Sequence, residues 1–548
     1  MTGGPVRPAA AAAADATARR TVTRFAAARV WRGGLVVASV AAGMSAVVVA
    51  TYRSTVGDSL DLAALAALAG NPAIRTLFGE PVALDRPGGF AVWRTAMVLS
   101  VLLAVWGLLA ATRTTRGEEE TGRWNLLLAG RVPLPAVLLR HLGVLVALQA
   151  VAGAAVAAAL VLAGAAPAGA VVHGAGLALV GAFFVAAGGL AAQLFAARPA
   201  ASGAAAAVLA AGVLVRMVGD GVAGLGWWRW LSPFGLLALS RPYQDGQTLV
   251  GTAAPLLVLA AATATLLAAA VHLAGRRDVQ AGVLAGRTGR SPRLRLLGSV
   301  EAFALRGGLP PLAGWAAGAG AFFLLIGLLA ASMTEFLSGN PVFAEAAAGA
   351  GFAGLGTVDG YAATLFELLA VPAGLFVAVR LAAVSLEESR GRLTLLCAQP
   401  IGRVRLLGAE MLSALAGTAG LLTVAALATW LGVAVTGNGI TVGAALAGTW
   451  NVLPIVLLSL GAAVFALGWA PDLVLVAGAL PGAGGFLLKV IAESTAAPHW
   501  VRDLSPFSHL APVPLLPPDW PASALMTGLA VGFGLLGLAG YRWRDLRG

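Results

Sequence analysis

Long apolar stretches alternate with short polar ones along nearly the whole 548-residue chain. A helix needs about 20 mostly apolar residues to cross the hydrocarbon core of a bilayer. A window of that length finds candidate spans in the first half near residues 34–52, 91–112, 141–164, 172–195, 200–218 and 248–274. It finds others in the second half near residues 310–332, 361–383, 408–432, 443–467, 472–491 and 522–541. The pattern predicts an all-α polytopic membrane protein with about 12 transmembrane helices.

The composition agrees with this interpretation. Hydrophobic residues make up 59% of the chain and charged residues only 11%, whereas soluble domains carry about 25% charged residues. The composition therefore argues against an ordinary soluble enzyme and against a nucleic-acid-binding protein, despite the net charge of +12. The single cysteine, Cys397, rules out an intrachain disulfide.

Arginine placement predicts the orientation of the helices. Arginines cluster between residues 19 and 32, 113 and 140, 276 and 306, and 542 and 547. The connection over residues 334–360 contains acids but no lysine or arginine. By the positive-inside rule, the arginine-rich segments are cytoplasmic and residues 334–360 are external. Both termini are then cytoplasmic, and residues 1–20 are expected to be a disordered cytoplasmic tail.

Four motifs recur in the same order in the two halves, at offsets of 269 to 274 positions. They are Arg32-Gly33-Gly34-Leu35 with Arg306-Gly307-Gly308-Leu309, Gly70-Asn71-Pro72 with Gly339-Asn340-Pro341, Glu118-Glu119-x-x-Gly122-Arg123 with Glu387-Glu388-x-x-Gly391-Arg392, and Trp227-x-Arg229-x-Leu231-Ser232-Pro233-Phe234 with Trp500-x-Arg502-x-Leu504-Ser505-Pro506-Phe507. An even number of spans in each copy makes the repeat parallel, with a pseudo-twofold axis along the membrane normal. We therefore expect a first six-helix half over residues 21–278, a flexible cytoplasmic linker over 279–295, and a second six-helix half over 296–548.

The Glu-Glu-x-x-Gly-Arg motif follows the second span of each half. Glu119 stands four positions before Arg123, and Glu388 four before Arg392, which is the favourable order for an ion pair along a helix. The motif therefore predicts a short helix that Pro133 or Pro400 ends. Such a helix could lie on the membrane surface or dock into a partner's groove. The alternative is a solvated charged loop that only sets the topology.

A serine before a proline is typical of a helix N-terminus. Ser232-Pro233 and Ser505-Pro506 therefore predict short outer or re-entrant helices before the last span of each half. Asn71-Pro72 and Asn340-Pro341 predict the same in the first outer loops. Trp227, Phe234, Trp500 and Phe507 accompany the serines, and tryptophan is typical of the membrane interface. These segments could act as an outer gate or as interface anchors.

Few ionisable residues lie within the predicted spans. Arg94 and Glu367 stand near the outer starts of equivalent spans in the two halves. They could form an intramembrane charge pair across the pseudo-twofold axis. The alternative is that each side chain snorkels to the outer surface.

No catalytic or metal-binding motif stands in the sequence. The only lysine is Lys489, so the chain cannot contain the Gly-Lys-Ser/Thr of a phosphate-binding loop. The five histidines are too scattered for a local metal site. We therefore expect no cofactor or metal in this chain and no enzymatic activity of its own.

On these motifs, together with Gly275-Arg276-Arg277-Asp278 and its echo Trp543-Arg544-Asp545, the chain resembles the permease subunits of ABC-2-type exporters. The resemblance is to the fused twelve-span actinobacterial type associated with tetronasin-like polyketide antibiotic and multidrug export. It implies a bacterial plasma-membrane exporter of hydrophobic drugs or lipid-like compounds. It also implies that two copies of a separate ABC ATPase bind ATP and Mg and drive the transport. The resemblance implies a coupling helix at Glu118, Glu119, Gly122, Arg123, Glu387, Glu388, Gly391 and Arg392.

Two other classes of function stay open at this point. One is a proton-coupled twelve-span carrier, and the other is a membrane enzyme or signalling scaffold. Dependence of transport on ATP or on a proton gradient would separate the first from the exporter.

Overall fold

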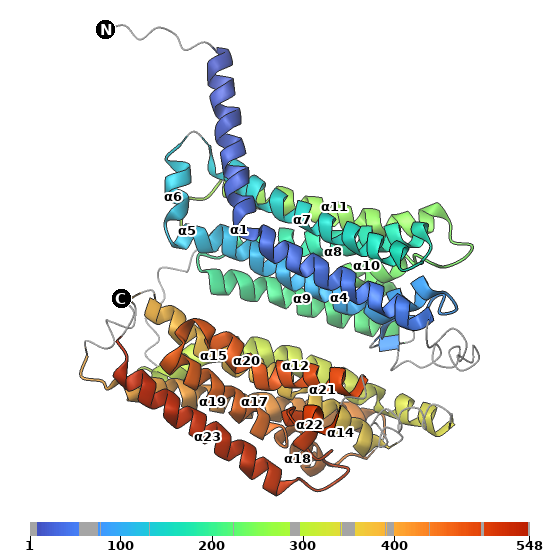
Figure 1. Ribbon diagram of the computed structural model, residues 1–548, viewed down its shortest axis with the longest axis vertical. Helices are drawn as coiled ribbons and strands as arrows, with labels where there is room; N and C mark the ends of the chain where they lie inside the picture. The colour runs from blue at the N-terminus through green and yellow to red at the C-terminus, as the bar shows by residue number, and fades with distance from the viewer. Residues whose placement is uncertain are drawn as a thin grey trace. The chain divides into compact units, whose positions relative to one another are not determined.

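The computed structural model describes the greater part of the chain. The described residues are 8–53, 75–76, 78–130, 132–222, 224–284, 296–339, 341, 357–389, 391, 399–437, 439–494 and 498–545. They contain helices and no β-strand. The chain divides into two compact units, Met1–Arg290 and Ser291–Gly548. Figure 1 shows the helices of each unit running roughly side by side.

The first unit contains the long helices of the first half and several short ones. Its elements are α1 (Pro8–Thr51), α4 (Pro87–Thr112), η2 (Arg113–Gly117), α5 (Glu118–Glu120), α6 (Arg123–Leu128), α7 (Leu134–Leu162), α8 (Pro167–Leu194), α9 (Arg198–Gly221), η3 (Gly226–Leu231), α10 (Pro233–Leu239) and α11 (Leu249–Ala274). Helix α8 packs against α4, α7 and α11 and so lies at the centre of the unit.

The second unit repeats this order with more interruptions. Its elements are α12 (Val300–Gly339), α14 (Val358–Leu368), α15 (Ala370–Ser389), α17 (Arg403–Val435), α18 (Val442–Trp450), α19 (Leu453–Trp469), η4 (Pro471–Leu473), α20 (Val474–Ala479), η5 (Leu480–Gly484), α21 (Gly485–Ser494), α22 (His499–Arg502), η6 (Pro506–His509) and α23 (Trp520–Trp543). Helices α12 and α17 pack together, as do α19 and α23.

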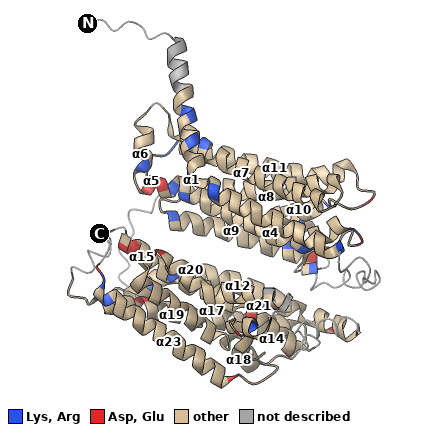
Figure 2. Cartoon of the chain, viewed as in Figure 1, with Lys and Arg blue, Asp and Glu red and all other residues tan. Residues whose placement is uncertain are grey.

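The prediction of 12 spans is confirmed. Within the described residues, 12 helical segments are long and apolar enough to cross a membrane, and each overlaps one predicted span. Figure 2 shows charged residues gathered near the helix ends of each unit, with long uncharged stretches between them. This distribution is expected because a charge near the bilayer centre costs about 2.5–3.5 kcal/mol.

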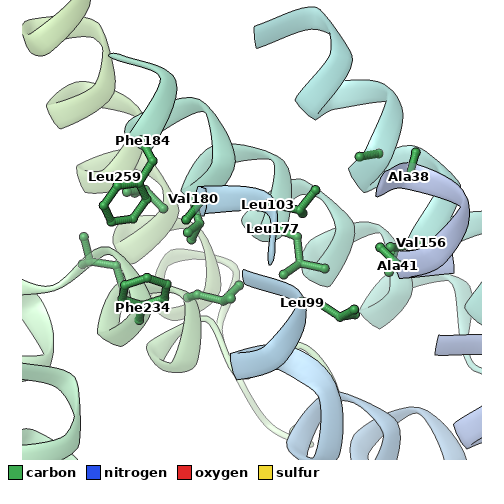
Figure 3. Packing of buried hydrophobic residues seen from close by; sticks show 14 of the residues in the cluster. Ala38, Ala41, Leu99, Leu103, Val156, Leu177, Val180, Phe184, Phe234 and Leu259 are labelled. Atoms are coloured by element: carbon green, nitrogen blue, oxygen red, sulfur yellow. The ribbon is translucent and has the colours of Figure 1, made fainter. Parts of the chain in front are cut away.

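Apolar side chains of several spans form the core of the first unit. Figure 3 shows Leu99, Leu177, Val180 and Phe184 among its buried residues. The Phe184 ring of α8 stacks on Phe234 of α10, with 5.5 Å between the ring centroids. The short helix α10 is thereby packed against the central span.

The predicted tail over residues 1–20 is helical in its described part. Helix α1 begins at Pro8, well before the first predicted span, and continues to Thr51 without a break. Residues 9–14 are all alanine, and alanine has the highest intrinsic helix propensity. The alanine run therefore extends the first span beyond its apolar part.

The described start of the predicted linker forms backbone hydrogen bonds with the end of α8. Val283 N–H donates to the Gln193 carbonyl at 3.0 Å, and Leu284 N–H donates to the Leu194 carbonyl at 2.9 Å. Residues 279–284 therefore lie along the end of α8 in the first unit. Residues 285–295 of the linker lie outside the described residues.

Candidate functional site

The repeated acidic motif begins where the second span of each half ends. In the first unit, α4 continues through the π-helical turn η2 into α5, which ends at a left-handed glycine. Gly122 has φ 73° and Gly391 has φ 70°. Their N–H groups donate to the carbonyls of Glu119 and Glu388, at 3.0 and 2.9 Å. The repeated glycine therefore ends the helix, because other L-residues rarely adopt positive φ.

Glu119 lies at the centre of a buried ion-pair cluster, which we call the Glu119 cluster and define as Arg116, Glu119, Arg277 and Gln280. Its carboxylate accepts from both terminal nitrogens of Arg277, at 2.6 and 2.8 Å, and from the Gln280 N–H at 2.6 Å. Arg116 Nη1 lies 3.1 Å from the same carboxylate. The side chains of Glu119 and Arg277 are only 1% and 2% exposed. Figure 2 shows the acidic α5 beside arginines at one end of the unit.

The predicted helical pair between Glu119 and Arg123 is wrong. The left-handed turn at Gly122 interrupts the helix, so the two residues no longer share one helical face. Arg123 instead contacts Glu118, with 3.1 Å between the charged groups. Pro133 does not end this helix either, because it is the N-cap of the following helix α7. The equivalent Arg392 lies outside the described residues.

The other two acids of the first motif also bind within the unit. Glu118 accepts from Arg29 of α1 at 2.7 Å. Glu120, the acid that the second copy lacks, accepts the N–H of Arg198 at the start of α9. An acid at a helix N-terminus is stabilising because it meets the free N–H groups and the positive end of the helix dipole. The three acids therefore join α5 to α1, to α9 and to the segment after α11.

The second unit builds the equivalent connection at Glu388. Arg544, just after α23, donates two hydrogen bonds of 2.6 Å to the Glu388 carboxylate. Its Nε also donates to the Leu467 carbonyl at 3.1 Å. Ser385 stands 269 positions after Arg116, and its hydroxyl donates to the Pro471 carbonyl at 2.9 Å. A cavity of about 230 Å³, lined in part by Ser385 and Glu388, lies at this position. Glu387 is half-buried.

The sequence prediction missed the partners of these acids. The sequence presents Arg277 and Arg544 only as part of a repeated Arg-Asp ending. It presents Arg116 only as one of the arginines that follow the second span. The signal was present, since an arginine directly before an aspartate follows the last span of both halves. The role of this arginine depends on a contact with an acid more than 150 positions earlier in the chain, and sequence spacing does not reveal such a contact.

The predicted N-caps at Ser232 and Ser505 are confirmed. The Ser232 hydroxyl accepts from the N–H groups of Phe234 and Gly235, and the Ser505 hydroxyl accepts from Phe507 N–H. Each hydroxyl also donates to a glycine carbonyl 20 positions earlier, at 2.6 Å for Ser232 and 2.8 Å for Ser505. One accepted and one donated hydrogen bond of the serine hydroxyl therefore recur in both proline-containing turns. Both serines are fully buried.

The tryptophans that precede the two Ser-Pro turns are exposed. Trp227 is 59% exposed and Trp500 is 68% exposed. Pro233 lies at the first position of α10, and Pro506 at the first position of η6. A gating role for these segments stays a prediction. Asn71, Pro72 and Asn340 lie outside the described residues.

The two predicted intramembrane charges have neighbours within their own units. Arg94 is exposed, and its guanidinium lies 5.8 Å from the centroid of the Phe78 ring. Glu367 forms an ion pair with Lys489, the single lysine of the chain. The pairing of Arg94 with Glu367 across the two units stays a prediction.

The chain has a similar relative across nearly its whole length. A family model described as "Multidrug efflux system permease Rv1217c, C-terminal domain" matches residues 297–542. Over 520 residues the chain is 31% identical to the multidrug efflux system permease protein Rv1217c of Mycobacterium tuberculosis (strain ATCC 25618 / H37Rv). The match covers 92% of this chain and 90% of the relative. The chain belongs to the Rv1217c family.

This member of the Rv1217c family is a multi-pass membrane protein with 12 candidate spans. Its described residues contain no group of three or more His, Cys, Asp or Glu side chains that could hold a metal ion. The Glu119 cluster and the Glu388–Arg544 pair each tie the ends of the second and last spans together within one unit. The buried acids therefore connect distant helices within each unit of this Rv1217c-family protein.

Proposed function

We propose that the chain is the transmembrane permease subunit of an ATP-driven exporter of ABC-2 type. It moves hydrophobic drugs, antibiotics or lipid-like compounds outward through the bacterial plasma membrane. Two copies of a separate ABC ATPase, one for each half, bind ATP and Mg and supply the energy. The observation that carries the proposal is the 31% identity, over 92% of the chain, to a protein named as a multidrug efflux system permease.

The proposal of a separate ATPase is supported by the lysine content of the chain. Lys489 is the only lysine, and it follows Leu488 instead of the glycine that a phosphate-binding loop requires. An exporter without that loop must take its energy from a partner or from an ion gradient. The internal repeat favours a partner, because two equivalent halves offer two equivalent docking positions.

The structure changes which residues are proposed to contact the ATPase. Glu118 and Glu119 are buried, so they position the segment and do not reach a partner. Helix α6 lies next to α5 in Figure 1. It is the exposed part of the segment that follows the second span. Its Trp124 is fully buried, 5.4 Å from the His141 ring, and anchors the helix on α7. Leu126 on the same helix is 82% exposed.

An anchored helix with an exposed apolar residue is suited to docking in a partner's groove. We therefore assign the coupling contact of the first half to α6, with Leu126 as its apolar anchor. The buried acids hold α6 in position and transmit force from it to the second and sixth spans. The corresponding residues 392–398 of the second half lie outside the described residues.

The test is transport by inverted vesicles that contain the chain with its co-expressed ATPase. We expect uptake of a hydrophobic dye on addition of ATP, and no uptake with a catalytically inactive ATPase. Dissipating the proton gradient should leave the ATP-driven uptake intact. Uptake that follows the proton gradient and ignores ATP would instead identify a proton-coupled carrier. Uptake under neither condition would favour a membrane enzyme or scaffold.

A further inference from the structure

The first unit contains a pocket that the proposed coupling machinery does not use. It lies at the end of the unit opposite the Glu119 cluster, between α4, α8, α9 and α10, and has a volume of about 70 Å³. Trp93, Met97, Phe234 and Leu237 form apolar parts of its wall. Apolar walls with a few convergent polar groups are the usual lining of a small-molecule site, and this volume suits a head group, because sites for whole ligands measure about 300–1,000 Å³.

Two buried polar side chains line this pocket without a protein partner. His173 of α8 is 1% exposed, and neither of its ring nitrogens has a hydrogen-bond partner among the described residues. Tyr243 is 6% exposed, and its hydroxyl also has no partner in the described part of the chain. A buried polar group without a partner is destabilising, because it has lost its hydrogen bonds to water and gained none. Two such groups on one pocket indicate that something else satisfies them.

The Tyr243 ring is held in place by two close glycines. Gly88, at the start of α4, and Gly169, in the first turn of α8, each lie so near the ring that an added Cβ would overlap it. The ring therefore occupies a slot between two helices. Burial raises the pKa of Tyr243 to about 12, so its hydroxyl keeps its proton and can donate a hydrogen bond at neutral pH.

The rim of the pocket is positively charged. Arg229 and Arg241 both donate to Glu80, at 2.8 and 2.7 Å. Arg216 lies 2.6 Å from Asp220. Among the described residues that line the pocket, the three arginines outnumber the one acid, Glu80. An acidic group is favoured over a basic one at such a rim.

The second half does not repeat these polar groups. At the offset of 273 positions that relates Ser232 to Ser505, Tyr243 corresponds to Leu516 and Arg241 to Pro514. His173 falls within residues 442–446 at any offset from 269 to 273, and that segment is Val-Gly-Ala-Ala-Leu. The pocket is therefore specific to the first half, although the surrounding fold is repeated.

We propose that this pocket binds the acidic end of a small amphiphile, whose carboxylate or phosphate accepts hydrogen bonds from His173 and Tyr243 and whose apolar body contacts Trp93 and Phe234. The ligand is either an exported compound or a membrane phospholipid, since both can present this chemistry. The proposal does not depend on how transport is energised.

A series of probes that differ only in the head group tests the preference for an acid. The probes are 1-naphthaleneacetic acid, 2-(1-naphthyl)ethanol and 2-(1-naphthyl)ethylamine, titrated into the full chain in phosphatidylcholine nanodiscs. Fluorescence anisotropy of the naphthalene ring reports binding. We expect the acid to bind about 10-fold more tightly than the alcohol, because hydrogen bonds to a charged acceptor are stronger than those to a neutral one. The amine should bind most weakly.

The variant Tyr243→Phe removes only the hydroxyl. It should weaken binding of the acid about 10-fold and leave the melting temperature of the unliganded chain unchanged or higher, because an unpartnered hydroxyl is lost. The matched control is Tyr361→Phe, since Tyr361 is also buried with a hydroxyl that lacks a partner in the described residues but does not line this pocket. Ala96→Leu, which adds bulk to the pocket wall, should abolish binding.

Repeating the titration in phosphatidylglycerol nanodiscs separates the two sources of the ligand. Loss of probe binding there identifies an anionic phospholipid as the occupant, whereas retained binding identifies an exported compound. The proposal is wrong if the amine binds as tightly as the acid or if Tyr243→Phe binds like the unmodified chain. A lower melting temperature for unliganded Tyr243→Phe would also contradict the proposal, because it would show that an ordered water already satisfies the hydroxyl.

Discussion

Glu119 of α5 and Arg277, just after α11, lie 158 positions apart and meet in a buried ion pair, with 2.6 Å between Arg277 Nη1 and Glu119 Oε1. Glu388 and Arg544 form the equivalent pair in the second unit, also at 2.6 Å. Both pairs connect the end of the second span to the end of the last span within one unit. In the first unit, the segment that carries α6 is thereby attached to two spans at once.

Breaking the Glu119–Arg277 pair from one side should destabilise the first unit. Glu119→Ala leaves Arg277 buried without its partner, which typically costs about 3–5 kcal/mol. We expect a lower melting temperature and less folded protein in the membrane, and a smaller loss for the double variant with Arg277→Ala. Glu335→Ala, at an exposed acid, is the control. Additive effects in this double-mutant cycle would show that the two side chains do not interact.

Gly122 and Gly391 should be sensitive to substitution for a reason of backbone geometry. Both have φ near 70°, where a Cβ costs roughly 1–2 kcal/mol. Gly122→Ala and Gly391→Ala should therefore each lower the melting temperature in detergent. Gly43→Ala and Gly203→Ala are matched controls, since both glycines are helical with open space around an added Cβ. These controls should be neutral or slightly stabilising, and equal losses at all four positions would reject the explanation.

Helix α6 should be required for ATPase docking and not for folding. Leu126→Glu places a charge on the proposed apolar anchor, so we expect at least a 10-fold loss of ATPase binding in pull-down titrations. The melting temperature should stay unchanged, because Leu126 is 82% exposed. Leu162→Glu is the control, since Leu162 is 87% exposed at the opposite end of α7. Normal ATPase binding by Leu126→Glu would place the coupling contact elsewhere.

The ion pairs of Glu80 with Arg229 and Arg241 should make the stability of the first unit sensitive to acid. Burial raises the pKa of Glu80, but the hydrogen bonds from Arg229 and Arg241 together lower it further, so it lies below its ordinary value of 4.5. A lowered folded-state pKa stabilises the fold above the unfolded pKa, and the gain is lost as the pH falls through the folded value. The melting temperature should therefore drop below about pH 4.5. Glu80→Gln should be less stable at pH 7 and show a smaller drop on acidification.

The predicted pair of Arg94 and Glu367 can be separated from the observed pair of Glu367 and Lys489. Two double-mutant cycles on melting temperature share the Glu367→Ala variant, one with Arg94→Ala and one with Lys489→Ala. We expect a coupling of about 0.5–3 kcal/mol between Glu367 and Lys489, as is usual for residues in contact. Coupling of Glu367 with Arg94 as well would support a pair across the halves. Additive effects in that cycle would leave Arg94 as an isolated outer charge.

The amino-acid sequence by itself determined the features that depend on near neighbours in the chain. The 12 spans follow from runs of about 20 apolar residues, and the caps at Ser232 and Ser505 from a serine placed before a proline. The internal repeat was also visible as a match of motifs. The spans and the caps are local features, because a helix or its cap depends on residues that are near neighbours in the chain.

Only the tertiary structure decided what the repeated acids contact. Spacing along one helix suggested Arg123 as the partner of Glu119, but the left-handed turn at Gly122 separates them and the packing of distant spans brings Arg277 to the carboxylate. The pocket beside His173 and Tyr243 likewise joins residues from α8 and the segment after α10. Which distant helices pack together depends on side-chain fit across the whole unit, and the local pattern of polar and apolar residues does not contain that information.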